Sequence, residues 1–244
     1  MRMFSLRTPV IGRQRGFSVV EIMIAMVASL IVVGSVLAFT VSTVQSNTEN
    51  VQATRLSQDL RAVMGLVTRE LRRAGYDEGS LDGIGRGTAY VSPFSTMQIV
   101  ANSALGCVTF AYDKEGGTAG SIDADRGELR AYRRAVINGV GVIQMRTGAN
   151  TSCQSAGGWN NLTDPQSSDV TAFTLNLPLS AVVGGSPLSD IGGDVPLRIR
   201  NVDIVLSGRV VGRPEIVRTM DSRVRVRADC IRTNLDDCNA VPAP

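Results

Sequence analysis

The sequence predicts an α+β protein in which one long amino-terminal helix packs on an antiparallel β-sheet head domain. An uncharged and largely apolar stretch covers residues 22–48, and a helical apolar stripe follows it as far as Gly75. Beyond Tyr76 the composition shifts to glycine, β-branched residues and turn-forming residues. We therefore expect three parts: a basic leader at 1–16, a long helix at 17–75 and a β-rich globular domain at 76–244.

The basic charge of the chain is concentrated at its amino end. Residues 1–16 contain four arginines and no acidic residue, whereas basic and acidic residues are nearly balanced in the remainder. The formal net charge of +3 therefore belongs to the leader and does not indicate a nucleic-acid-binding surface. Positive charge before an apolar span favours an amino end in the cytoplasm. We expect a single crossing of the inner membrane, with residues 76–244 in the periplasm.

Residues 22–39 form an apolar run long enough to cross a bilayer. The run is interrupted only by Ser29, Gly34 and Ser35, and its length reaches the lower limit of about 17–25 residues for a spanning helix. A secretory signal peptide would have a shorter run ending in a small-residue cleavage site, which is not found here. We expect the transmembrane part at about residues 17–40, in contact with lipid.

Cleavage is expected at the peptide bond between Gly16 and Phe17, where a flexible residue separates the leader from the span. The surrounding segment RQRGFSVVEIMIAM, residues 13–26, combines basic residues, this glycine, an aromatic residue and a glutamate in register with the span. It resembles the class III signal of type IV pilins and type II secretion pseudopilins. The resemblance implies that a dedicated peptidase cuts after Gly16 and methylates the new amino terminus, Phe17.

Glu21 places an acidic side chain at the start of the apolar span. An unpaired carboxylate within a span costs about 2.5–3.5 kcal/mol, so a partner that neutralises it is expected. The resemblance implies that this partner is the Phe17 ammonium of a neighbouring subunit in an assembling filament. The alternative is that Glu21 lies at headgroup depth near the helix start, where the helix dipole favours an acid.

The helix continues beyond the membrane with an amphipathic pattern. Apolar residues recur at steps of three and four, at Leu56, Leu60, Val63 or Met64, Val67, Leu71 and Ala74. Two arginines followed by Gly75 predict the carboxyl end of the helix. The segment LRRAGY, residues 71–76, resembles the end of the long helix in PilW-type minor pilins, and the order of segments in the following domain is similar to theirs.

Short strands separated by turns containing Gly, Asp, Ser or Pro are expected in the rest of the chain. They are predicted at Thr96–Ala101, Cys107–Tyr112, Glu128–Arg134, Val140–Arg146, Val170–Leu177, Leu197–Leu206 and Ile216–Arg227. Arginine and valine alternate strictly along residues 223–227, so the valines should face a core and the arginines solvent or a partner. Contact between this arginine row and phosphate is the less favoured alternative.

The cysteines, at Cys107, Cys153, Cys230 and Cys238, all follow the apolar span. An even number at wide spacing indicates two disulfides in an oxidising compartment, and the alternative is a set of buried free thiols. The sequence alone permits three pairings. The resemblance to PilW-type proteins implies that Cys107 pairs with Cys153 and Cys230 with Cys238.

Other chemical signals are weak. The chain has no histidine, which removes the commonest general base and the commonest zinc ligand. GIGRG at residues 83–87 is expected to be a flexible turn rather than a nucleotide-binding loop. DADRGE at residues 123–128 begins like a calcium loop but lacks its later ligands, which favours a hairpin turn. Trp159 is expected to pack over the sheet beside Cys153 rather than form an exposed contact.

The sequence thus predicts a structural protein without enzymatic activity or cofactor. The resemblance implies a minor pilin that primes or caps a type IV pilus. Its partners would be other minor pilins, the major pilin, the prepilin peptidase and methylase, and the inner-membrane assembly platform, without direct nucleic-acid contact. One alternative is a minor pseudopilin of type II secretion, of the GspJ kind. The alternative from another class is an envelope enzyme or ligand-binding domain that has an apolar anchor.

Overall fold

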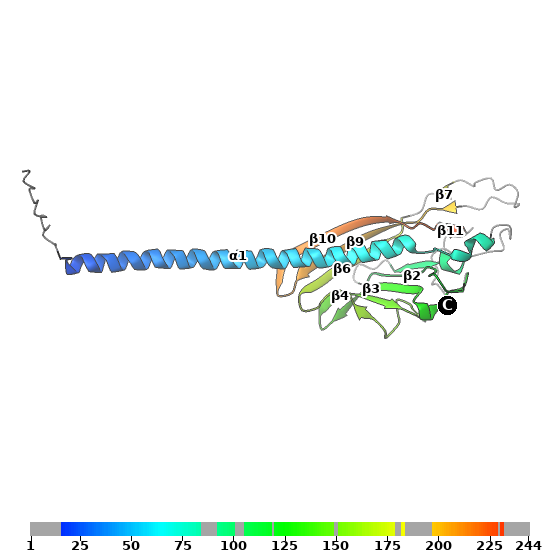
Figure 1. Cartoon of the computed structure of the whole chain (residues 1–244), viewed down its shortest axis with the longest axis horizontal. Coiled ribbons are helices and arrows are strands. Elements are labelled where there is room, and N and C mark those ends of the chain that lie inside the picture. The colour runs from blue at the N-terminus through cyan, green and yellow to red at the C-terminus, as the bar shows by residue number, and fades with distance from the viewer. Residues whose placement is uncertain are drawn as a thin grey trace, which may run out of the picture. The chain divides into compact units, whose positions relative to one another are not determined.

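The computed structural model describes residues 16–83, 92–100, 105–118, 120–148, 151–178, 182–183, 197–228 and 230–231. The chain consists of two compact units, Met1–Glu49 and Asn50–Pro244. Helix α1 (Val19–Arg73) supplies the described helical part of the first unit and continues into the second, where the β-strands lie (Figure 1). The predicted combination of one long helix and antiparallel sheets is confirmed.

The largest sheet has the order β1-β2-β3-β4-β5, and each neighbouring pair is antiparallel. Its strands are β1 (Met97–Val100), β2 (Cys107–Ala111), β3 (Leu129–Ile137), β4 (Val140–Thr147) and β5 (Asn160–Asn161). The turn between β3 and β4 is Asn138–Gly139, and both residues have positive φ, at 51° and 83°. This is the geometry that two-residue hairpins favour because it matches the strand twist.

A second sheet has the order β10-β9-β6, again antiparallel. Its strands are β6 (Ser168–Asn176), β9 (Asn201–Val210) and β10 (Arg213–Arg225). Both sheets lie along the carboxyl-terminal part of α1 (Figure 1). A third sheet joins three two-residue strands in the order β11-β8-β7. These strands are β7 (Val182–Val183), β8 (Leu197–Arg198) and β11 (Cys230–Ile231).

Short 3-10 helices connect several of these elements. They are η1 (Glu78–Gly83), η3 (Pro93–Ser95) and η4 (Ala124–Arg126). The first follows α1, the second precedes β1, and the third lies in the connection between β2 and β3. Of the GIGRG segment only Gly83 is described, and the other four residues lie outside the described ranges.

The prediction of one strand over Leu197–Leu206 is wrong. The chain leaves β8 after Arg198 and enters β9, in a different sheet, at Asn201. The break is caused by Arg200, which is 2% exposed and donates hydrogen bonds to the carbonyl oxygens of Ser95 (2.6 Å) and Ala228 (2.9 Å). A buried guanidinium needs such acceptors, and a strand that continued straight would direct it elsewhere.

The core forms where the stripe on α1 meets the two larger sheets. Leu56, Leu60 and Leu71 are at most 2% exposed. They pack with buried residues from both sheets and from the positions directly after β2 and β10: Met97, Val108, Phe110, Tyr112, Tyr132, Ile143, Val170, Phe173, Leu175, Val202, Ile204, Leu206, Val210, Val224 and Val226. Full burial of one leucine side chain stabilises by about 1.5–3 kcal/mol, so this stripe attaches the helix firmly to the sheets.

Gly75 ends the helix where the sequence predicts, in the left-handed conformation with φ +79°. Its N–H donates to the Ala111 carbonyl at 2.8 Å, which connects the helix end to β2. A Cβ at this position would lie 2.8 Å from the Ala228 Cβ and 3.0 Å from Arg200 Nη2. The glycine of LRRAGY is therefore required both by backbone conformation and by a close approach of the chain.

Candidate functional site

The first candidate site is the start of α1, where the predicted processing residues lie. Gly16, Phe17 and Ser18 precede the helix, and the Ser18 carbonyl accepts hydrogen bonds from the N–H groups of Glu21 (3.0 Å) and Ile22 (3.1 Å). Glu21 thus lies in the first helical turn, where the positive end of the helix dipole favours a carboxylate. The peptide bond between Gly16 and Phe17 lies just outside the helix.

The Glu21 side chain belongs to a shallow apolar depression on one side of the helix. The depression is lined by Phe17, Glu21, Ile22, Ala25, Met26 and Ser29. Glu21 forms no side-chain hydrogen bond or ion pair with any residue that the structure describes. An exposed carboxylate without a partner is thereby placed among apolar side chains, next to the residue predicted to become the amino terminus.

The helix that follows is exposed and apolar over residues 19–44. By length and composition, α1 is long and apolar enough to cross a membrane, and none of its most apolar window is buried. Four of its hydroxyl groups, on Ser29, Ser35, Thr40 and Thr43, bond back to the helix, as in Ser29 to the Met26 carbonyl (2.8 Å) and Thr40 to the Val36 carbonyl (2.8 Å). Each of these bonds satisfies a hydroxyl donor without water, which suits an apolar environment.

A second cluster lies deep in the head, between α1 and the five-stranded sheet. Glu70 on α1 is 5% exposed and accepts a hydrogen bond of 2.6 Å from the Tyr112 hydroxyl. Arg130 Nε on β3 lies 3.3 Å from Glu70 Oε2. The guanidinium groups of Arg73 and Arg130 lie 4.7 Å and 5.1 Å from the centre of the Tyr112 ring. A buried acid is thus paired with a cation and a hydroxyl across the helix–sheet boundary.

The surroundings of Tyr112 change its acid–base behaviour. Burial, followed by the hydrogen bond to Glu70, raises the pKa of Tyr112 to about 12. Burial and the nearby Glu70 charge also raise the pKa of Tyr132 above its ordinary value. Both hydroxyls are therefore neutral at physiological pH, and Tyr112 acts as a donor to the carboxylate. This cluster connects α1 to the sheet side of the head.

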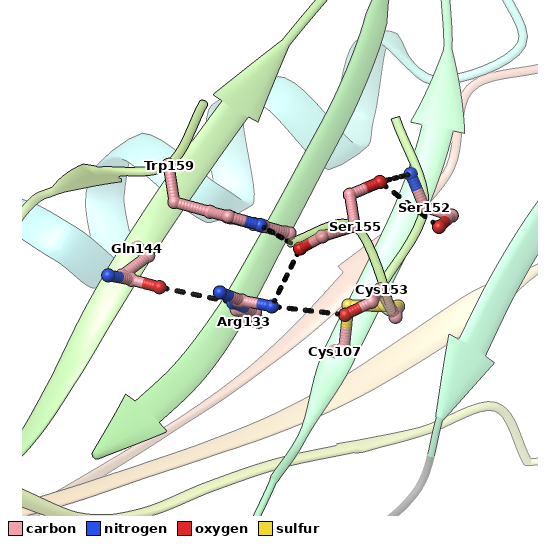
Figure 2. The surroundings of a disulfide bond; sticks show 7 residues. All are labelled: Cys107, Arg133, Gln144, Ser152, Cys153, Ser155 and Trp159. Carbon is pink, nitrogen blue, oxygen red and sulfur yellow. Dashed lines mark hydrogen bonds between the residues drawn. A yellow bond between two sulfur atoms is a disulfide. The ribbon is translucent and has the colours of Figure 1, made fainter. Parts of the chain in front are cut away.

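The disulfide between Cys107 and Cys153 attaches a loop to the first residue of β2 (Figure 2). This confirms the pairing implied by the resemblance. Arg133 on β3 supports the same loop, because its Nη1 donates to the carbonyls of Cys153 (3.2 Å) and Ser155 (3.3 Å). The other predicted pair lies outside the described residues, since Cys238 is not among them.

Trp159 packs on this loop, as predicted. The Arg133 guanidinium lies 3.9 Å from the centre of the Trp159 ring, and the indole N–H donates to the Ser155 carbonyl at 2.8 Å (Figure 2). Burial and the neighbouring Arg146 lower the pKa of Arg133 from its usual value. The indole and the disulfide therefore fix one loop through two independent attachments.

The DADRGE segment forms a turn whose carboxylates are used internally. Asp123 Oδ1 accepts from the N–H groups of Asp125 and Arg126, and Gly127 takes the left-handed conformation with φ +68°. Glu128 is fully buried and accepts from the backbone N–H groups of Lys114 and Asp123. These bonds explain Asp123 and Glu128 as turn and capping groups.

The arginine row behaves as its alternation predicts. Along residues 223–227 the arginines are exposed, whereas the two valines between them are fully buried. Arg223 forms two hydrogen bonds to Asp203, at 2.5 Å and 3.0 Å. At least one of these arginines is thus held by a carboxylate on the neighbouring strand, the usual state of a cation on a strand face.

Comparison with known proteins identifies the head and the helix that carries it. Residues 49–226 match the family model described as prepilin peptidase-dependent protein B, which is more than half of the chain. The chain belongs to this family. Residues 11–37 match the model described as the prokaryotic N-terminal methylation motif, which confirms the predicted prepilin-type amino-terminal motif. This member of the prepilin peptidase-dependent protein B family thus carries a prepilin-type amino-terminal motif at the start of α1.

This family member was also compared with solved structures and with curated proteins. Among solved structures it is similar to a type IV-like pilin from Thermus thermophilus, with 14% sequence identity and a TM-score of 0.35. The similarity covers 70% of this chain and 97% of that one. No curated protein matches the sequence. The finer assignment to the PilW type stays a prediction.

Three polar residues of this prepilin peptidase-dependent protein B family member were not predicted to lie in its interior: Glu70, Arg130 and Arg200. Glu70 stands three residues after Val67 and four before Ala74, so it falls within the apolar stripe of α1. That position was a usable signal, because a buried acid requires a cation or donors. No comparable signal marked Arg130 as the cation, or Arg200 as buried, since the sequence contains many arginines and contact depends on the sheet arrangement.

Proposed function

We propose that this chain is a minor pilin, of the PilW kind, that primes or caps type IV pilus assembly together with other minor pilins. The observation that carries the proposal is the register at the amino end: glycine, phenylalanine and glutamate stand directly before and within the first turn of a long exposed apolar helix. The match to the N-terminal methylation motif over residues 11–37 supports it. The role is structural and uses no cofactor.

Processing is the first step of the proposal. The chain enters the inner membrane with residues 1–16 in the cytoplasm and the head in the periplasm, as the leader charge favours. A prepilin peptidase cuts between Gly16 and Phe17, and the new amine of Phe17 is methylated. The name of the family, prepilin peptidase-dependent protein B, supports this dependence. The bond to be cut precedes the regular helix, so its cleavage needs no unwinding of α1.

Neutralisation of Glu21 drives the second step. The carboxylate has no partner within the described chain, and an unpaired carboxylate in the bilayer core costs about 2.5–3.5 kcal/mol. In a filament, the amine at the start of a neighbouring subunit's helix would lie beside Glu21 and remove this cost. Such an amine exists only after cleavage, so processing and assembly become linked. The partners are other minor pilins and the major pilin, extracted by the inner-membrane assembly platform.

The head contributes a rigid body attached to the helix. Its attachments are the leucine stripe, the pair of Glu70 and Arg130, and the glycine contact at the helix end. A head packed on the carboxyl-terminal part of α1 can present the same surface each time a subunit enters the filament. This is a structural requirement of a priming or capping subunit.

The test is the intact mass of the protein from membranes of cells with and without the prepilin peptidase. The proposal expects a chain that begins at Phe17 and carries one methyl group in the first case, and the unprocessed chain in the second. A chain that keeps its leader in the presence of the peptidase overturns the proposal. Deletion of the gene is expected to reduce surface pili and to leave type II secretion unchanged, and the reverse outcome contradicts the pilus assignment.

A further inference from the structure

We propose that the free edge of β10, together with the groove between it and α1, binds an extended acidic segment of a partner polypeptide as an added β-strand. The groove is lined by Ser57, Arg61 and Met64 from α1 and by residues 218–222 of β10. This surface lies in the head and is independent of the proposed roles of Phe17 and Glu21.

The edge of β10 is available for pairing. Within the described part of the chain, β10 is the last strand of its sheet and pairs with β9 alone. An unpaired strand edge presents N–H and C=O groups that a second chain can use. Proteins commonly protect such edges with prolines and bulges. In β10 these devices, Pro214 and an irregular register between Arg213 and Val217, are confined to one end, whereas residues 217–225 pair continuously with β9.

The groove has an apolar floor. Met220 pairs in register with the buried Leu206, so its side chain points to the face that α1 covers, and it packs against the core. Met64 on α1 is 9% exposed and lines the same groove. Two methionines form an adaptable surface that accepts different apolar side chains. An added strand would direct every second side chain into this groove.

The rims of the groove are basic. Arg61 on α1 and Arg218 on β10 both line it and are exposed. Neither forms an ion pair with a carboxylate in the part of the chain that the structure describes. Asp221 pairs in register with the exposed Val205, so its side chain belongs to the opposite face of the strand. The groove face therefore favours a strand with acidic side chains on either side of an apolar one.

The test uses the full-length protein in detergent and a fluorescent heptapeptide with blocked ends, Thr-Glu-Thr-Val-Thr-Glu-Thr. Binding is measured by fluorescence anisotropy, and contact with β10 by protection of its amides from hydrogen exchange. A peptide with lysine in place of both glutamates is expected to bind more weakly, by a factor of roughly ten or more. Two further peptides carry N-methyl groups on the even or the odd residues. Since alternate amides of an added strand face β10, one of these is expected to lose binding and the other to keep it.

Matched variants distinguish binding in the groove from a general effect of the protein's charge on peptide binding. The double variant R61E and R218E is expected to weaken binding of the acidic peptide by roughly tenfold. R55E makes one such charge reversal on an exposed face of α1 that does not line the groove, and is expected to change binding of the acidic peptide by less than about threefold. Circular dichroism confirms that each variant is folded.

Three results would overturn the proposal. The first is equal binding of the acidic and basic peptides, and the second is equal loss with both N-methylated peptides. The third is a protein that binds neither peptide but forms a dimer that R61E and R218E dissociate. In that case the occupant of the edge is a second copy of this chain.

Discussion

Tyr112 on the sheet side of the head donates a 2.6 Å hydrogen bond to the buried carboxylate of Glu70 on α1, across a sequence separation of 42 residues. With Arg130 Nε 3.3 Å from the same carboxylate oxygen, this contact connects the helix to the five-stranded sheet at a single buried point. In the proposed filament the helices pack together, so the position of each head depends on how rigidly it is attached to its helix.

Replacement of Glu70 by alanine should destabilise the head. The change leaves the Arg130 cation and the Tyr112 hydroxyl without their acceptor in a buried place, and we expect a loss of about 3 kcal/mol in the free energy of unfolding. Glu215→Ala, at an exposed position on β10, serves as the control and should change stability by less than about 0.5 kcal/mol. Chemical denaturation of the full-length protein in detergent measures both. A loss of less than about 1 kcal/mol for Glu70→Ala would show that the cluster contributes little.

Alkaline pH should weaken the head through Tyr112. In the folded protein the pKa of Tyr112 is raised to about 12, whereas an unfolded tyrosine titrates near pH 10. The neutral phenol therefore stabilises the folded state fully below pH 10, and this contribution is lost as the pH rises from 10 to 12. The measurement is the free energy of unfolding across this range for the natural protein and for Tyr112→Phe.

The phenylalanine variant should show a smaller decline between pH 10 and 12. It keeps part of the decline because the pKa of Tyr132 is also raised. The tyrosinate absorbance of the folded protein supplies an independent record of the titration. Identical pH profiles for the two proteins would contradict the assignment of the raised pKa to Tyr112.

The glycine that ends α1 allows a matched test of close approach. Gly75 and Gly212 have nearly equal positive φ, at +79° and +78°, but only Gly75 has atoms near its potential Cβ. Alanine at Gly212 should cost about 1 kcal/mol from backbone conformation alone, and alanine at Gly75 about 2–4 kcal/mol because Ala228 must also move. Equal losses at the two positions, measured by chemical denaturation, would show that the approach of Ala228 is easily relieved.

Removal of the disulfide should loosen the loop that carries Trp159. The bond between Cys107 and Cys153 closes a separation of 46 residues, for which chain-entropy reasoning gives about 2–4 kcal/mol of stabilisation. A double variant with alanine at both positions should lose this amount and show faster hydrogen exchange in residues 151–163. Unchanged exchange in that loop would mean that Arg133 and the indole hold it without the disulfide.

The sequence was sufficient to predict the long helix and most of the longer strands, but not their long-range contacts. The stripe from Leu56 to Ala74 and the glycine at position 75 are local patterns, and the structure confirms the helix they predict. The alternation at residues 223–227 likewise placed its valines in the core. The pairing of Glu70 with Arg130, by contrast, depends on the position of the sheet against the helix. The break at Arg200 could not be predicted either. It depends on hydrogen bonds to the carbonyl oxygens of Ser95 and Ala228, which lie far away in the sequence.

In the candidate site, too, some features could be predicted from the sequence and others could not. Gly16, Phe17 and Glu21 could be selected from the sequence because their register is itself the signal. Two features could be found only in the three-dimensional structure. One is the set of hydroxyl groups that bond back to α1, and the other is the absence of a partner for Glu21 among the described residues. The groove beside β10 could not be predicted, since it is formed by residues from two elements distant in the sequence.

Zero-length carbodiimide cross-linking of assembled pili tests whether Glu21 lies against the free amine of a neighbouring processed subunit. Lys114 is the only lysine in the sequence, so the Lys114→Arg variant leaves the Phe17 amine as the only primary or methylated amine in the processed chain. Mass spectrometry of the digested filaments then identifies each joined pair.

We expect an amide that joins the Glu21 side chain to the amino-terminal amine of an adjacent subunit. Glu21→Gln should remain inserted and cleaved but should lose this product and enter filaments poorly. If Glu21→Gln enters filaments at the normal level and the natural protein yields no such cross-link, the account of Glu21 is contradicted.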